Sequence, residues 1–219
     1  MNPFIVADPA KCIGCRTCEV ACVVSHQENQ NCAAVTAKTF TSRIRVVKGG
    51  TFTTAVTCHQ CEDAPCANVC PTQAIIAPHR LDARRCIAYL TIEHEGAIDP
   101  ALRPLIGNRI FGCDDCQLVC PWNKFARRTD EPDFRARNAL DTARLADLFA
   151  WDEDEFLQRT EGSPIRRSGH RRWLRNIAIA LGNAPTTPGT IAALHSRRHS
   201  GDALVDEHIE WALAQHGMA

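Results

Sequence analysis

Apolar residues recur with helical periodicity through the last third of the chain. In the run RLADLFAWDEDEFLQRT, the acidic stretch from Asp152 to Glu155 suits the start of a helix, because carboxylates stabilise the positive amino end. The apolar positions at helical offsets in this run are Leu145, Leu148, Phe149, Phe156 and Leu157. The pattern predicts helical structure here, with one helix beginning at the acidic stretch.

The run RRWLRNIAIALGNA predicts a longer helix that ends at Gly182-Asn183, a C-cap signal. Its broad apolar face consists of Trp173, Leu174, Ile177, Ala180 and Leu181. Two more helical runs follow, PGTIAALHSRR and DALVDEHIEWALAQH. The inward positions of the last run are Val205, Ile209, Ala212 and Leu213. Short antiparallel helices joined by such turns are typical of HEAT-type repeats, and we expect Trp173 and Trp211 in their core.

Composition indicates one or two modest domains, since the chain has 219 residues and a formal net charge of zero. Neutrality gives no overall attraction to nucleic acid or membrane, so any such contact must come from a local patch. The opening MNPFIVADPAKC has no secretory or twin-arginine signal, and no apolar run reaches the roughly 18 residues of a membrane span. The sequence therefore predicts a cytoplasmic protein without membrane segments.

Thirteen cysteines are the main chemical feature, and all lie between Cys12 and Cys120. They form three groups with distinct spacings. The run CIGCRTCEVAC, spaced C-x2-C-x2-C-x3-C, contains Cys12, Cys15, Cys18 and Cys22. The run CHQCEDAPCANVCP, spaced C-x2-C-x4-C-x3-C-P, contains Cys58, Cys61, Cys66 and Cys70. The run CDDCQLVCPW, spaced C-x2-C-x3-C-P, contains Cys113, Cys116 and Cys120, with Cys86 alone upstream. In a reducing cytosol, such clustering favours metal binding over disulfides.

Zinc and simple buried thiols are the alternatives to iron–sulfur clusters for the second and third groups. Zinc takes two pairs of ligands around one tetrahedral ion. A compact run of three cysteines, with a fourth before proline, is instead typical of cubane clusters, in which the fourth thiolate binds the neighbouring cluster. Applied here, this rule assigns one 4Fe-4S cluster to Cys58, Cys61, Cys66 and Cys120. It assigns the other to Cys70, Cys86, Cys113 and Cys116, so eight cysteines fill eight ligand positions.

The first group matches the loop pattern but has no reciprocal partner group, and only Cys32 is left over. Three outcomes stay open. Its four cysteines hold a third cluster among themselves, with or without Cys32 in place of one of them; another chain completes the site; or the site is empty. The groups and the helical runs together predict an α+β fold in three parts: a segment with one cysteine group (1–56), a ferredoxin-like double 4Fe-4S domain (57–125) and an all-α HEAT-like domain (126–219).

Residues 1 to about 70 resemble the polyferredoxin electron-transfer subunits of hydrogenases and formate dehydrogenases. The resemblance rests on KCIGCRTCEVACVVSHQENQ and CHQCEDAPCANVCP. That family usually carries four such groups, the first paired with the last, and this chain departs from it because the continuation after the second group is absent. The resemblance implies electron transfer to a redox partner protein.

From about residue 70 onward, the chain resembles the C-terminal part of epoxyqueuosine reductase, a cobalamin-dependent enzyme that makes the last reduction in queuosine synthesis in tRNA. The matching runs include RLDARRCIAYLTIEHEG and LRPLIGNRIFGCDDCQLVCPWNKFA. The resemblance implies cluster ligands at Cys70, Cys86, Cys113, Cys116 and Cys120, in agreement with the spacing rule. The polyferredoxin-like segment stands in place of that family's cobalamin-binding catalytic domain. We therefore expect a join near Cys70 and no cobalamin binding by this chain alone.

Positive charge is concentrated in the run IRRSGHRRWLR, which contains no acid. A solvated helix face is one interpretation, and a phosphate-contacting surface is the other, because arginine binds phosphate in a forked geometry. The resemblance to a tRNA-acting enzyme favours RNA. The candidate RNA-binding residues are Arg166, Arg167, Arg171, Arg172 and Arg175, with His170 among them.

No nucleophile–base pair, His-based zinc motif, glycine-rich dinucleotide motif or P-loop is evident, so we assign no catalytic residue and no nucleotide cofactor. Clusters held by four cysteines leave no open position for substrate. The leading hypothesis is therefore an iron–sulfur protein that relays single electrons to a redox partner. The first alternative is an epoxyqueuosine-reductase-like protein of tRNA modification without its own cobalamin domain. The second is an RNA- or protein-binding module with structural clusters.

Overall fold

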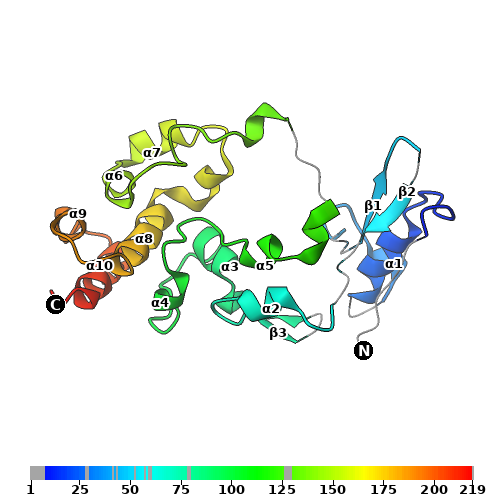
Figure 1. Cartoon of the computed structure of the whole chain (residues 1–219), viewed down its shortest axis with the longest axis horizontal. Helices are drawn as coiled ribbons and strands as arrows, with labels where there is room; N and C mark the ends of the chain where they lie inside the picture. Colours follow the sequence, from blue (N-terminus) through cyan, green and yellow to red (C-terminus); the bar gives the residue numbers. More distant parts are fainter. Residues whose placement is uncertain are drawn as a thin grey trace. The chain divides into compact units, whose positions relative to one another are not determined.

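The computed structural model describes residues 8–27, 30–40, 42, 44–51, 53–56, 58, 61–77, 80–125 and 130–218. The chain divides into two compact units, Met1–Ala64 and Pro65–Ala219 (Figure 1). The division into three parts expected from the sequence stays a prediction, and its boundary residues 57 and 126 lie outside the described residues.

The first unit combines a helix with a β-hairpin. Its elements are α1 (Thr17–Ser25), the 3-10 turn η1 (Cys32–Ala34), β1 (Arg45–Lys48) and β2 (Thr53–Val56). The two strands pair antiparallel, with Val46 opposite Ala55. Glu19 of α1 is buried, and its carboxylate accepts a hydrogen bond from the Val46 amide at 2.7 Å, which fixes the helix to the hairpin.

The second unit is mostly helical with one small hairpin. Its first half contains α2 (Pro65–Val69), β3 (Ile75–Ala77), β4 (Arg80–Leu81), η2 (Ala83–Arg85), α3 (Ile87–Ile92), α4 (Arg103–Ile106), α5 (Asp115–Leu118) and η3 (Pro121–Phe125). Its second half contains η4 (Pro132–Phe134), α6 (Leu145–Phe149), α7 (Glu153–Arg159), η5 (Pro164–Ser168), α8 (Gly169–Gly182), α9 (Pro188–Ser196) and α10 (Ala203–Gln215). β3 and β4 pair antiparallel with a bulge. Helices and small sheets agree with the expected mixed class at this coarse level, while the HEAT-like detail stays a prediction.

Helix α8 is the central element of the second unit, with α10 packed along it and α6, α7 and α9 also against it (Figure 1). The apolar face predicted for α8 is confirmed, since all five of its residues are buried. Trp173 is 1% exposed and stacks on Trp151 with ring centroids 5.7 Å apart, whereas Trp211 is only partly buried. The four inward positions expected in α10 are also buried.

The helix start at the acidic stretch is confirmed as well. Asp152 is the N-cap of α7, and its carboxylate accepts a hydrogen bond from the Glu155 amide at 2.8 Å. An aspartate in this position satisfies an amide that the helix itself leaves unpaired. Phe149 and Phe156, on the two sides of the cap, are both buried in the main core.

Gly182 ends α8 as predicted, but for a different physical reason than a left-handed cap. The capping residue Asn183 has φ −90°, and Gly182 is not among the residues with positive φ. A Cβ on Gly182 would lie 2.7 Å from Trp211 Cζ3 and 2.9 Å from the Ala212 Cα. Glycine is therefore required because α10 approaches α8 too closely for any side chain.

The two halves of the second unit share their interior. A second core cluster consists of Ile87, Leu90, Ile98, Ile106 and, from α8, Ile179. The segment that carries the later cysteines is thus packed on the helical half, which explains why residues 65–219 form one unit. None of the helices in the described part of the chain has the length and apolar character needed to cross a membrane.

Candidate iron–sulfur centre

In the loop that follows Cys70, the cysteine sulfur accepts a hydrogen bond from the backbone. Cys70 Sγ accepts a hydrogen bond from the Ala74 amide at 3.2 Å and lies 3.7 Å from Thr72 Oγ1. Burial alone would raise the pKa of the Cys70 thiol, but these hydrogen bonds together lower it. Arg85 Nε donates to the Thr72 carbonyl at 2.8 Å, which fixes the residue before Cys86 to the residues after Cys70.

The loop that holds Cys113 and Cys116 turns through a left-handed residue. Asp114 has φ 58°, and α5 begins at the next residue. Burial raises the pKa of both the Cys113 and Cys116 thiols, and for Cys116 the nearby Cys86, Cys113 and Cys66 raise it further. All four of these cysteines belong to the second unit. Bound iron would supply the positive charge that keeps such thiols deprotonated.

All four cysteines of the expected second ligand set lie within one unit. Cys66 of the expected first set lies on α2, and this helix packs against α5, which carries Cys116. Cys70 and Cys86 are connected through the Arg85 contact. The expected first set takes Cys66 and Cys120 from this unit and two cysteines from the first unit, Cys58 and Cys61, so its grouping rests on spacing.

Zinc and a cubane cluster place different demands on their cysteine ligands. Over the residues that the structure describes, no group of three or more Cys, His, Asp or Glu side chains is arranged to hold a single metal ion. A structural zinc site needs four ligands around one ion. In a cubane cluster each cysteine binds a different iron, so its ligands stand farther apart. The amide donor on Cys70 is also the kind of hydrogen bond that tunes cluster sulfur ligands.

The first cysteine group has the same local backbone as the third. Arg16, between Cys15 and Cys18, has φ 62° and ψ 9°, where Asp114 has φ 58° and ψ 4°. In both loops a helix begins at the residue after this left-handed one, and the next cysteine, Cys18 or Cys116, is the second residue of that helix. In both, three residues then precede the last cysteine of the group. The two loops can therefore present sulfur atoms in the same way.

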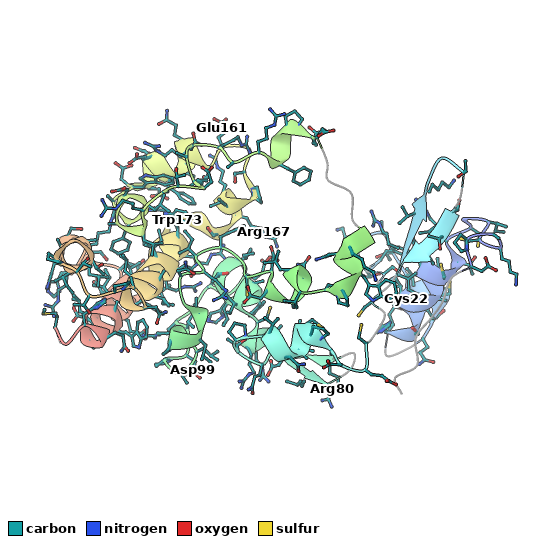
Figure 2. The ribbon with its side chains drawn as sticks, in the orientation of Figure 1. Cys22, Arg80, Asp99, Glu161, Arg167 and Trp173 are labelled. Carbon is teal, nitrogen blue, oxygen red and sulfur yellow. The ribbon has the colours of Figure 1, made fainter. Side chains whose placement is uncertain are left out.

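The remaining cysteines of the first unit have different surroundings. Hydrogen bonds from Thr17 lower the pKa of the exposed Cys15 thiol. Cys22 is buried on α1 (Figure 2), with its Sγ 3.9 Å from His26 Nδ1. Cys12 is partly buried, and Cys32 is exposed on η1.

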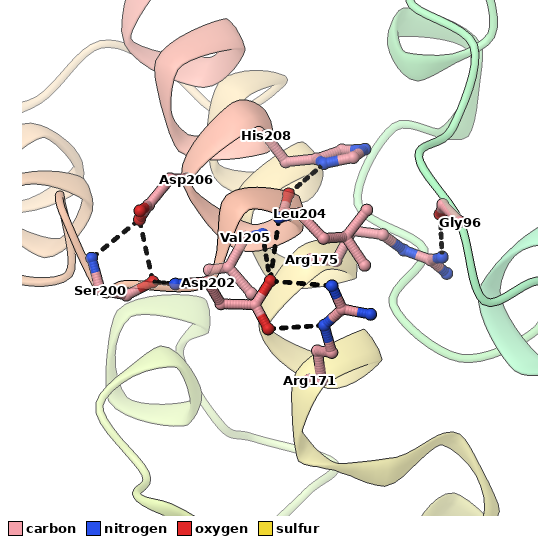
Figure 3. A network of polar contacts seen from close by, with 9 residues as sticks. All are labelled: Gly96, Arg171, Arg175, Ser200, Asp202, Leu204, Val205, Asp206 and His208. Atoms are coloured by element: carbon pink, nitrogen blue, oxygen red, sulfur yellow. Dashed lines mark hydrogen bonds and ion pairs between the residues drawn. The ribbon is translucent and has the colours of Figure 1, made fainter.

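The candidate RNA-binding arginines fall into two classes. Arg175 is fully buried and donates to the carbonyls of Leu90 at 2.6 Å, His94 at 2.8 Å and Gly96 at 2.7 Å (Figure 3 shows the contact with Gly96). Burial, and next to it the charge of Arg172, lowers the pKa of Arg175 to about 10. Contrary to the sequence-based expectation, Arg175 holds two segments of the chain together instead of facing solvent.

Arg172 is also engaged internally, since it donates to the carbonyls of Ile92 and Glu93 at 2.9 and 3.1 Å. Arg166 is exposed. Arg167 (Figure 2) is 69% exposed and lies 2.8 Å from the Glu93 carboxylate. Arg171 is 57% exposed and makes a two-pronged contact with Asp202 (Figure 3).

Sequence reasoning missed that polar side chains of α8 and of its C-cap residue face the cysteine-bearing half. These side chains bind backbone carbonyls of residues 90–110. They belong to Arg172, Arg175, Asn176 and Asn183. The helical spacing of these residues could have predicted that they share one face of α8. The run of positive charge favoured a phosphate-binding interpretation instead.

Known proteins match most of this chain. Residues 57–123, which include all eight expected ligands of the two clusters, match the family described as 4Fe-4S double cluster binding domain. Over 165 residues the chain is 73% identical to epoxyqueuosine reductase of Xanthomonas campestris pv. campestris, a match that covers 75% of this chain and 46% of that protein. Most of this chain is homologous to epoxyqueuosine reductase. The Escherichia coli K12 epoxyqueuosine reductase is 58% identical over 158 residues, which cover 72% of this chain and 41% of that protein.

Solved structures of epoxyqueuosine reductase share the fold. One, determined with an epoxyqueuosine-modified tRNA-Tyr stem loop, has a TM-score of 0.65 and 28% identity and covers 71% of this chain and 41% of its own. The enzyme from Bacillus subtilis has a TM-score of 0.65 and 25% identity, over 75% of this chain and 46% of its own. The chain spans less than half the length of these relatives. The homology favours the tRNA-modification alternative over the electron-relay hypothesis, and the polyferredoxin resemblance stays a prediction.

Proposed function

We propose that this chain is the iron–sulfur and tRNA-contacting part of an epoxyqueuosine-reductase-type system that modifies tRNA. The observation that carries the proposal is the homology over three quarters of the chain, in the same unit that gathers Cys86, Cys113 and Cys116. The 4Fe-4S clusters, when bound, supply single electrons. Cysteine fills every ligand position, so the reduction of the nucleoside belongs to a separate cobalamin-holding site that this chain serves.

We assign the ligands as the cysteine spacing indicates. Cys70, Cys86, Cys113 and Cys116 bind one cluster, and their grouping in a single unit supports the assignment. Cys58, Cys61, Cys66 and Cys120 bind the other. The amide that donates to Cys70 Sγ stabilises the thiolate form of this ligand.

A third cluster at Cys12, Cys15, Cys18 and Cys22 is supported by the backbone that the first loop shares with the third. The left-handed residue after Cys15 turns the chain into a helix whose second residue is the next cysteine, as happens after Cys113. We therefore prefer a loaded first group to an empty one.

The tRNA contact is assigned to the exposed arginines, Arg166, Arg167 and Arg171. The side chains of Arg167 and Arg171 are more than half exposed, and they already pair with Glu93 and Asp202. Phosphate would therefore compete with these two carboxylates for the arginines. Arginine–phosphate contacts release counterions, so the affinity should fall steeply as salt increases. Arg172 and Arg175 are left out of this surface because their donors are used on backbone carbonyls.

One anaerobic preparation tests both parts. We expect about twelve iron atoms per chain with the first group loaded, whereas about eight would leave two clusters and overturn the third. We also expect a gel shift with epoxyqueuosine-containing tRNA at low salt, which weakens in an Arg166→Ala, Arg167→Ala double variant. Arg84→Ala is the matched control, since Arg84 is 87% exposed and pairs only locally with Asp82.

The outcomes separate the hypotheses. A chain without iron would overturn the cluster assignment. A chain loaded with iron that binds no tRNA at low salt would overturn the tRNA part and return the electron-relay hypothesis to first place. Equal weakening by the Arg84 variant would show that the shift reflects bulk charge and not the proposed surface.

A further inference from the structure

Cys86 and Cys113 are expected to bind one cluster although 26 residues separate them. Within each cysteine group, only two to four residues lie between neighbouring cysteines, and the backbone itself limits the distance between the sulfur atoms. A long connecting segment leaves that distance unset and must be closed at a cost in conformational entropy. Other contacts must therefore hold the two cysteines in register.

The side chain of Thr91 bridges the two ends of this segment. Thr91 Oγ1 donates to the carbonyl of Ile87, the residue directly after Cys86, at 2.7 Å. The same oxygen accepts a hydrogen bond from the amide of Gly112, the residue directly before Cys113, at 2.9 Å. Thr91 is fully buried, so water cannot replace either bond.

Asn176 of α8 fixes this bridge from the other side. Its Nδ2 donates to the Thr91 carbonyl at 2.8 Å and to the Ile110 carbonyl at 2.9 Å. Its Oδ1 accepts from the Arg175 guanidinium at 2.9 Å, which orients the amide. Asn176 is 1% exposed, and α3 packs against α8 at this point (Figure 1). One side chain of the helical half therefore holds both ends of the long segment.

We propose that Thr91 and Asn176 are positioning residues for the second cluster, which set the separation of Cys86 and Cys113. The inference rests on the ligand set proposed above. It assigns a role to two residues that bind no iron and touch no RNA. It also predicts that loading of the second cluster depends on a side chain of α8.

Thr91→Val tests the proposal, because valine keeps the shape of threonine and removes the hydroxyl. The matched control is Thr160→Val. Thr160 is likewise fully buried, and its Oγ1 donates to the carbonyl four residues earlier, Phe156, at 2.6 Å. Thr160 differs from Thr91 because its hydroxyl is not bonded to a residue next to a cysteine, as the Thr91 hydroxyl is to Gly112. Thr91→Ser should restore the bridge. Iron per chain, the EPR spectrum of the reduced clusters and their midpoint potentials are measured anaerobically for all variants.

We expect Thr91→Val to lose about four iron atoms per chain relative to wild type, or to shift the EPR signal and potential of one cluster, while Thr160→Val does neither. If Thr91→Val does not fold, Asn176→Asp gives the answer. It keeps the acceptor for Arg175 and removes both donors. Wild-type iron, spectrum and potential in a folded Thr91 or Asn176 variant would overturn the inference. A wild-type chain without iron would instead overturn the proposed function beneath it.

Discussion

Acidification is expected to destabilise residues 65–219 through His208, a fully buried side chain of α10. Its Nδ1 donates to the Leu204 carbonyl at 2.7 Å (Figure 3), and its Nε2 accepts from the Ile98 amide at 3.2 Å. Both ring nitrogens are used by the neutral form, and a proton on Nε2 would face the Ile98 amide. The folded protein therefore holds the His208 side chain in its neutral form.

The size of the effect follows from the pKa of His208. Burial is the largest effect and lowers this pKa from 6.5 to about 4. The hydrogen bond to Leu204 is the next largest effect and opposes burial, as does Glu207, while the charges of Arg103 and Arg175 lower the pKa further. Because the folded pKa lies below the unfolded one, the stability is fully present above pH 6.5 and is lost as the pH falls towards 4. Linkage gives a loss of about 2 kcal/mol between pH 7 and pH 5, and about 3 kcal/mol in all.

Denaturant unfolding followed by far-UV circular dichroism at pH 7 and pH 5 measures this loss. His208→Gln is the reference, since glutamine does not titrate and all other acid effects, those on thiols and clusters included, are common to both proteins. The stability difference between wild type and variant should change by about 2 kcal/mol between the two pH values. An unchanged difference would refute the buried, neutral state of His208.

Two further predictions concern α8 and α7. Gly182→Ala should lower the free energy of unfolding by about 1–3 kcal/mol in thermal melts, because the new Cβ meets Trp211 and the α10 backbone. Gly189→Ala is its control, since a Cβ there meets nothing nearer than 3.9 Å, and equal effects would contradict the close packing. Asp152→Ala should cost about 1 kcal/mol through loss of the α7 cap, and Asp152→Ser should recover most of it. A serine variant as unstable as the alanine variant would mean that the cap bond is not the cause.

The sequence predicted best what depends on local periodicity. The buried face of α8, the end of that helix and the capped start of α7 follow from spacing and from one capping residue, and the structure has all three. The reason for Gly182 could not be derived, because a local turn and a close tertiary approach select the same residue.

The arginine run shows that burial of a charged side chain could not be predicted from the local sequence. Arg167 and Arg175 look equivalent in the sequence, yet one is mostly exposed and the other is fully buried. Their difference is set by residues 90–96, which lie some 80 positions away in the chain and bring unpaired carbonyls against one side of α8. A charge count cannot tell a donor that meets solvent from one that meets a distant backbone.

The long segment between Cys86 and Cys113 has a consequence for how such a protein can be inherited. Its carbonyls are paired by α8, and Arg103 within it binds Glu207 of α10, so a break between the cysteine-bearing half and the helical half would leave buried polar groups unpaired. Recombination within residues 65–219 would therefore break buried bonds, whereas a division at Ala64 and Pro65 cuts none of them and separates only Cys58 and Cys61 from the later cysteines. We therefore expect the helical half to be inherited as one piece with the segment from Cys66 to Cys120.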